Sequence, residues 1–478
     1  MNPSDKHIIR KLIIDLNMGG EKEAFAVQQE IGEIIRNQVN VLLDQYFKSI
    51  SPNGDHLRID KLEIDLGDLD RNHLYEELTE KILNALDKQI KDQLNKGIYK
   101  AKSLKLSPLR EEDGSEREGI QLMDNEESGM ELLIYYLIHG HYPWWGGNIS
   151  IQELEQTLTN LFGLEDKDAT VKKNEWMEIL MHTFYAHPRA RERFVFQFKE
   201  SLYHALVSYL EPLKSDFFAE IEKIFIKVYR QAEEGHSSGY GAGPEEMVRS
   251  RIIHALFEVR SSHHTENGFL KDFLRSALER LAGLTNKLSR RELLEALIGE
   301  ESRNIRNETF VARHKTICDA LRWIEKSNID KDFEKSKKSD TVKDKIQEPY
   351  KGDNGHLIEN AGLVLIAWFL PHLFWNLELL KNDRFIHDQA LHKAIHLSRF
   401  LVTGRQHAEE RQLLLNKMLC GTDKDFPVVK EWEFAEKEQN SCYEMLEAII
   451  RHWGILKDTT PKGLQENFLQ REGLLNWR

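Results

Sequence analysis

The sequence has little cysteine and no apolar leader. Only Cys318, Cys420 and Cys442 occur among 478 residues, and none belongs to a CxxC pair. An odd, widely spaced set does not support a disulfide framework and favours synthesis in a reducing cytoplasm. The first residues, MNPSDKH, contain no apolar stretch of the signal-peptide type, so no secretory signal peptide is expected.

The sequence also lacks an excess of positive charge. Its net charge is −13, and binding to nucleic acid phosphates needs a concentrated Lys/Arg surface, so no nucleic-acid partner is predicted. Charged residues make up 30% and hydrophobic residues 40%, which is typical of globular proteins rather than of disordered chains. At roughly 100–200 residues per domain, this length predicts two to four packed units.

Motifs for catalysis are missing or incomplete. No GxSxG occurs, and GYGAG (239–243) lacks the preceding strand and the GK[ST] ending of a phosphate-binding loop. His392 and His396 stand one helical turn apart, as in HExxH zinc proteases, but Lys393 occupies the position of the catalytic Glu. We therefore predict no enzyme, catalytic residue, metal or cofactor. A metal-dependent enzyme using His387, His392 and His396 is the alternative.

The N-terminal residues 1–98 predict a small β-α-β-α unit. The Ile-rich segment 7–16 and the alternating segment 56–66 are typical of strands. Segments 21–50 and 73–94 carry apolar residues at helical spacing. The two strands are expected to pair, with the helices on one face.

The rest of the chain predicts helices separated by polar segments. The fold class expected is therefore mainly α and multi-unit, and no heptad pattern supports a coiled coil. The predicted parts are a charged linker (99–128), a helical unit with an aromatic turn (129–234), a flexible break (235–244), a helical unit (245–326), a charged linker (327–355) and a C-terminal helical unit (356–478).

Two segments invite a functional interpretation. The stretch AGLVLIAWFLPHLFW (361–375) is shorter than the ~20 residues of a bilayer span, which favours a buried core helix. The alternative is that 361–380 meets a membrane or another apolar surface. In HYPWWGG (141–147), one of Trp144 and Trp145 is expected to pack on the preceding helix, leaving the other to anchor a partner. Equally, both could cap the local helices.

Three patterns in order resemble one known family. They are the N-terminal unit with LRIDKLEIDLGDL (57–69), the segment LLIYYLIHGHYPWW (132–145), and the C-terminal run ENAGLVLIAWFLPHLF (359–374), AIHLSRFLVTG (394–404), LLLNKMLCG (413–421) and LEAIIRHWGILKDTTPKGLQENFLQREGLL (446–475). Together they resemble the contractile injection system tape measure protein family, encoded with phage-tail-like contractile particles. The positions expected to define it are Asp60, Leu62, Asp65, Gly67, Pro143, Trp144, Gly362, Asn416, Leu419, Gly421, Trp453, Phe468, Gln470, Arg471 and Gly473.

The resemblance implies a structural or assembly component that controls tube length or tube assembly. The alternative is a transient assembly chaperone or interaction scaffold absent from the finished particle. The implied partners are the inner tube, baseplate or cap proteins of the particle. Association of the protein with further copies of itself is compatible with this role. The implied location is the cytoplasm during assembly and, where the protein stays in the particle, the released extracellular particle. The candidate interaction residues are Trp144, Trp145, Trp368, Phe369, Phe374, Trp375, Trp453, Phe468 and Arg471.

The helical breaks bear on how such a protein could measure length. One unbroken helix of this chain would span about 700 Å at about 1.5 Å per residue. Gly, Pro and charged segments instead divide the sequence into short helices. We therefore expect several compact units rather than one extended helical ruler.

Overall fold

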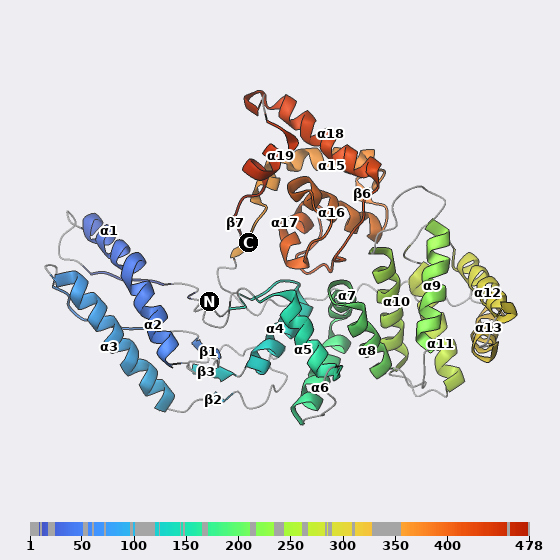
Figure 1. Cartoon of the computed structure of the whole chain (residues 1–478), viewed down its shortest axis with the longest axis horizontal. Helices are drawn as coiled ribbons and strands as arrows, with labels where there is room; N and C mark the ends of the chain where they lie inside the picture. The colour runs from blue at the N-terminus through green and yellow to red at the C-terminus, as the bar shows by residue number, and fades with distance from the viewer. Residues whose placement is uncertain are drawn as a thin grey trace. The chain divides into compact units, whose positions relative to one another are not determined.

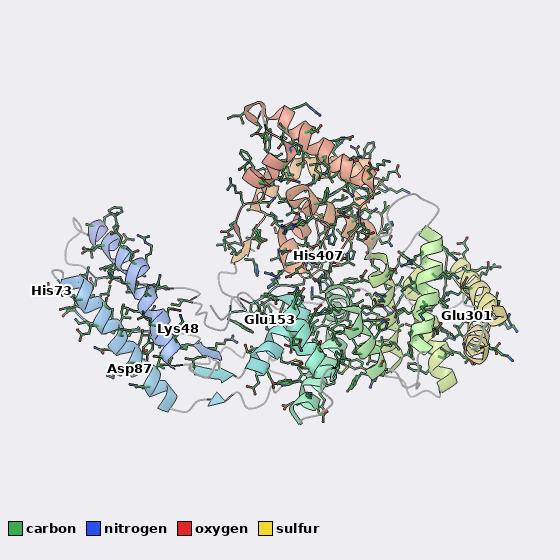
Figure 2. The ribbon with its side chains drawn as sticks, in the orientation of Figure 1. Lys48, His73, Asp87, Glu153, Glu301 and His407 are labelled. Atoms are coloured by element: carbon green, nitrogen blue, oxygen red, sulfur yellow. The ribbon has the colours of Figure 1, made fainter. Side chains whose placement is uncertain are left out.

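The structure is a computed structural model (Figures 1 and 2). It describes residues 9, 12–17, 24–50, 56–59, 62–70, 73–95, 99–100, 120–123, 125–143, 145–146, 149–164, 171–210, 217–233, 243–260, 266–282, 284, 289–307, 311–326, 355–456 and 459–476. Most of the predicted linkers 99–128 and 327–355 and of the predicted break 235–244 lie outside these residues. The described part is mainly helical, as the sequence predicted.

The chain divides into two compact units, each of which is described by itself. The first comprises Met1–Tyr135, Tyr142–Thr157 and Ala169–Ile179, and the second comprises Tyr136–His141, Leu158–Asp168 and Leu180–Arg478. The boundary falls within helix α4 (Asn125–His139), so the last turn of that helix belongs to the second unit.

The first unit begins with one continuous helical run. It consists of α1 (Ala24–Ile34), the π-helical turn η2 (Ile35–Val39) and α2 (Asn40–Ile50), and its apolar stripe packs with α3 (Leu74–Asn95). Val27, Ile31, Leu43, Leu78 and Leu86 are buried in this core. Ion pairs between residues four positions apart lie on the exposed faces of these helices. Lys48 pairs with Asp44, and Asp87 pairs with Lys91; Lys48 and Asp87 are labelled in Figure 2.

The strands of the first unit differ from the prediction. β1 (His56–Ile59) pairs antiparallel with β3 (Ile120–Met123), and β2 (Tyr99–Lys100) pairs parallel with β3. Thus the partner of β1, and the strand on the other side of that partner, both come from the predicted linker 99–128. The expected strand 7–16 is wrong for its described residues, Ile9 and 12–16, which are exposed and form no ladder.

Of the described residues in the predicted strand 56–66, His56–Ile59 form a strand and residues 62–66 do not. Leu62, Ile64 and Leu66 still alternate inward, but they pack on the core of α1 to α3 rather than continuing a sheet. Alternation therefore correctly indicated a segment with one apolar side. It did not identify the surface against which that side packs.

The regular secondary structure in the described middle of the chain is helical. The helices are α5 (Ile151–Phe162), α6 (Val171–Ala186), α7 (Pro188–Gln197), α8 (Glu200–Leu210), α9 (Phe217–Glu233), α10 (Gly243–Arg260), α11 (Glu266–Ala282), α12 (Arg290–Asn307) and α13 (Val311–Lys326). Residues 188–210 form two helices, α7 and α8, rather than one. Phe198 takes an extended conformation between α7 and α8 and is buried, so core packing outweighs helical continuity there.

The C-terminal segment is the last part of the second unit and consists mostly of short elements, with the longer helices α16 and α18. In order they are β4 (Gly355–Ile358), the 3₁₀ helix η5 (Ala361–Phe369), α15 (Leu370–Asn376), β5 (Leu380–Lys381), β6 (Arg384–Phe385), α16 (Asp388–Thr403), η6 (Glu410–Leu413), α17 (Leu414–Leu419), α18 (Glu436–His452), η7 (Gly454–Leu456), α19 (Pro461–Leu464), η8 (Gln465–Leu469) and β7 (Gly473–Asn476).

The two ends of this segment pair with each other. β4 and β7 form an antiparallel ladder in which Leu357 lies opposite Leu474 (Figure 1). α16 is buried along most of its length and supplies the core. No helix in the described ranges combines the length and apolar character needed to cross a bilayer.

Candidate interaction surface

The most apolar segment of the sequence forms a helix with two apolar faces. η5 and α15 run on directly from Ala361 to Asn376. Leu363, Ile366, Leu370, Leu373 and Phe374 are buried on one side. The expected core helix is therefore correct for this side only.

The opposite side presents apolar side chains to solvent. We call Val364, Leu365, Trp368 and Trp375 the C-terminal apolar face. Trp368 is 91% exposed, Trp375 69%, and Val364 and Leu365 about half exposed. Leu365, Trp368 and Trp375 recur at helical spacing, so they share one side of the helical segment. Exposed tryptophans of this kind are typical anchors of protein interfaces.

A close backbone approach fixes η5 in place. A Cβ atom on Gly362 would lie 1.9 Å from the carbonyl oxygen of Phe468, so only glycine allows η5 to reach η8. The amide of Ala361 donates to the carbonyl of Arg471 at 2.8 Å. A Cβ on Gly473 would meet the side chain of Ala361 at 2.6 Å. These contacts explain two of the glycines that the resemblance singled out.

Side-chain amides, of which those of Asn360 and Asn416 are buried, join the same region to α16. Asn416 accepts a hydrogen bond from the Asn360 side chain at 2.8 Å and donates one to the Ser398 hydroxyl at 2.8 Å. The Gln470 side chain donates to the carbonyl of Val402 at 3.0 Å. Because unsatisfied buried amides are costly, the bonds of Asn416 hold the start of η5, α16 and α17 in one arrangement, and the bond of Gln470 ties the end of η8 to α16. Asn416 and Gln470 therefore have positioning roles.

The other candidate interaction residues of the C-terminal segment differ in how far their side chains are exposed to solvent. Phe374 is 3% exposed and packs against Phe385 at a ring distance of 5.7 Å, so assigning it to a surface was wrong. Phe369 and Trp453 are half-buried, and the Phe369 ring lies 6.4 Å from that of His452. Phe468 and Arg471 are exposed. No partner is present, so their role in binding stays a prediction.

The aromatic turn belongs to the first unit, apart from His141. Trp145 is half-buried, and the guanidinium carbon of Arg58 lies 5.3 Å from its ring centroid. Arg58 also pairs with Glu131 on α4 at 3.1 Å. A Cβ on Gly146 would lie 2.6 Å from the Leu132 side chain, so the turn packs tightly on α4. Trp144 lies outside the described residues.

A buried charge network, which sequence analysis did not identify, lies in the second unit. Arg193 on α7 pairs through two nitrogens with both oxygens of Glu410, at 2.8 and 3.0 Å. Lys417 donates to the same carboxylate at 2.6 Å, and all three side chains have no exposed surface. Arg193 also donates to the backbone carbonyls of Leu137, Ile138 and Asp425, the last at 2.7 Å. The network thus fixes the end of α4, α7 and η6 together.

The histidine pair His392 and His396 clamps the backbone of Val429. The amide of Val429 donates to Nδ1 of His392 at 3.3 Å, and Nε2 of His396 donates to the Val429 carbonyl at 2.7 Å. Burial lowers the pKa of His392 to about 3 and that of His396 to about 4. Both rings are therefore neutral at pH 7. His387 accepts a bond from the Ala390 amide and caps α16.

Comparison with known proteins identifies the family. The family model described as contractile injection system tape measure protein matches residues 6–478. Neither the curated proteins nor the solved structures include a match to this chain. Because the matched range is nearly the whole sequence, the chain belongs to the contractile injection system tape measure protein family.

Proposed function

We propose that the protein is a structural, non-enzymatic component that organises assembly of the inner tube of a contractile particle. The observation that carries this proposal is the family match over residues 6–478. The C-terminal apolar face supports it, because large exposed tryptophans are suited to contacts with particle proteins. Synthesis and assembly in the cytoplasm accord with the cysteine content.

Helix lengths favour assembly control over direct measurement. The longest continuous helical run among the described residues is Ala24–Ile50, about 40 Å at about 1.5 Å per residue. A helical ruler would instead use one long helix whose length scales with the tube. We therefore propose that this protein starts or organises tube growth through its folded units.

Changing the linker length tests this proposal. Duplicating residues 327–354 should leave particle length unchanged, whereas deleting the gene should abolish particles or make their lengths irregular. Electron microscopy of purified particles measures both. Tubes lengthened in proportion to the insert would indicate a ruler. Normal particles from the deletion strain would exclude an assembly role. Mass spectrometry of finished particles then separates a retained component from a transient chaperone.

Replacing Trp368 with Ser tests the C-terminal apolar face. Its side chain is 91% exposed, so the free energy of unfolding should change by no more than about 0.5 kcal/mol. Loss of an interface anchor should weaken capture of particle proteins about 30-fold, corresponding to about 2 kcal/mol. Pull-down from cells that express the particle genes, with quantified partners, measures this loss.

Phe25→Ser is the matched control, since Phe25 is a 78% exposed aromatic residue on α1. Capture should be unchanged in this variant. Equal capture by the Trp368→Ser variant and the wild-type protein would exclude the C-terminal apolar face as the contact.

A further inference from the structure

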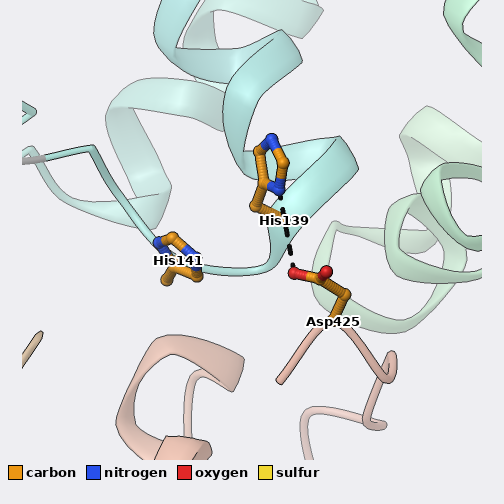
Figure 3. A group of neighbouring side chains, drawn as sticks. All are labelled: His139, His141 and Asp425. Carbon is orange, nitrogen blue, oxygen red and sulfur yellow. Dashed lines mark ion pairs between the residues drawn. The ribbon is translucent and has the colours of Figure 1, made fainter. Parts of the chain in front are cut away.

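Three side chains with metal-binding atoms converge in the second unit. They are His139 and His141, at and just after the end of α4, and Asp425, in the loop between α17 and α18 (Figure 3). Each can offer one nitrogen or oxygen, and these atoms all lie within 4.8 Å of one another. Sequence analysis missed the group because Asp425 is distant along the chain.

The backbone between the two histidines is built for this arrangement. Gly140 has a φ of +73°, which glycine adopts without strain. A Cβ at this position would lie 2.1 Å from Glu410 and 2.8 Å from Arg193. The turn is therefore pressed against the buried charge network and cannot easily move. A preorganised backbone lowers the entropic cost of bringing ligands to a metal.

The surroundings leave Asp425 facing the imidazoles. Its side chain is 13% exposed, that of His139 15%, and His141 is 5% exposed. Oδ1 of Asp425 is buried, accepts no hydrogen bond from the described residues, and lies 3.7 Å from Nδ1 of His139. The nearby cations Arg193 and Lys417 are engaged by Glu410 instead.

We propose that His139, His141 and Asp425 bind one Zn²⁺. Two imidazoles and a carboxylate form a donor set that zinc accepts, with metal–ligand distances of about 2.0–2.2 Å. In a tetrahedral zinc site the ligand atoms lie about 3.3 Å apart. The three ligand atoms here lie within 4.8 Å of one another, so side-chain rotations that bring them closer by about 1.5 Å complete the site. The centroid of the His356 ring lies 4.4 Å from that of His141, which makes His356 a candidate for the fourth ligand.

The ion acts as a structural cross-link in this site. It joins the last turn of α4 to the loop that carries Asp425 and, through His356, to β4. Zinc that binds the folded chain and not the unfolded chain raises the melting temperature by mass action. This consequence is independent of the proposed role in particle assembly.

A second group of the same type provides a control. Glu200, His204 and Glu222 also bring their ligand atoms within 4.8 Å. Here, however, the Arg249 guanidinium donates hydrogen bonds to both carboxylates, at 2.7 Å to Oε1 of Glu200 and 2.6 Å to Oε1 of Glu222. The guanidinium already supplies the positive charge, so we expect no zinc there.

The experiment titrates zinc chloride into the untagged full-length chain after dialysis against EDTA, in competition with a chromogenic chelator. The wild-type protein should bind one Zn²⁺. His139→Gln and Asp425→Asn should each weaken binding at least about 10- to 100-fold, and His204→Gln should not. Zinc should also raise the melting temperature of the wild-type protein and of His204→Gln, but not that of Asp425→Asn.

Asp425→Asn decides the question if His139→Gln does not fold, because asparagine keeps the shape of the side chain. Its melting temperature without zinc should match that of the wild-type protein. Absence of zinc binding by the wild-type chain would overturn the proposal. So would wild-type affinity in Asp425→Asn, or loss of binding in His204→Gln.

Discussion

Replacing Glu410 with Gln is expected to lower the free energy of unfolding by about 3–5 kcal/mol. The glutamine keeps the size of the side chain but removes the charge that faces Arg193 and Lys417. Both cations are fully buried, and both bond to this carboxylate. An uncompensated buried charge is strongly destabilising, because the protein interior cannot replace its hydration. Urea denaturation followed by circular dichroism measures the change.

Two further variants separate the network from charge in general. Lys417→Met should cost less than Glu410→Gln, because Arg193 and Glu410 still pair through two bonds. Glu295→Gln breaks an exposed helical pair with Arg291 and should cost no more than about 0.5 kcal/mol. A loss of less than about 1 kcal/mol in Glu410→Gln would contradict a stabilising role for the network.

Lowering the pH from 7 to 5 is expected to remove about 4 kcal/mol of stability through His392 and His396. Burial depresses their folded-state pKa values to about 3 and about 4, against 6.5 for the unfolded chain. Below pH 6.5 the unfolded chain therefore binds more protons, and stability falls as the pH drops towards about 4. Protonation of His392 Nδ1 would also break its bond from the Val429 amide.

Other charges around the clamp modulate this effect. Glu192 raises the pKa of His392, whereas Arg251, Lys417 and His396 lower it. Glu431 raises and His407 lowers the pKa of His396. Because burial is the largest cause for both rings, the direction of the shift is set by their place in the core.

The measurement compares urea denaturation at several pH values with a variant carrying His392→Asn and His396→Gln. The amides can reproduce the bonds to Val429 but do not titrate, so the slope between pH 6.5 and 5 should flatten. His372→Asn changes an exposed histidine on α15 and should retain the wild-type slope. An unchanged slope in the double variant would show that the acid sensitivity arises elsewhere.

The sequence predicted the N-terminal helices well and their strands poorly. The apolar residues at helical spacing in 21–50 and 73–94 correspond to the helical run that ends at Ile50 and to the helix that begins at Leu74. Such spacing can be recognised locally, because the residues on one face of a helix lie only three or four positions apart along the chain. Strand partners are not encoded locally. Thus β1 pairs with Ile120–Met123, in a segment whose charge predicted a linker.

The candidate interaction surface was predictable as an apolar segment but not as a surface. Periodicity cannot distinguish the buried Phe374 from the exposed Trp375, because both faces of 361–376 are apolar. Packing against η8 decides which face is covered. Gly362 shows this dependence, since it contacts the backbone of Phe468 more than a hundred residues along the chain.

The sequence by itself determined the mainly helical class, the positions of most helices and, through separated motifs, the family. Each of these depends on local periodicity or on residue order. Tertiary structure alone decided the strand partners, the exposed side of η5 and α15, the pairing of Arg193 with Glu410 and the meeting of His139 with Asp425. These features join distant residues, and only the folded core determines which of them become neighbours.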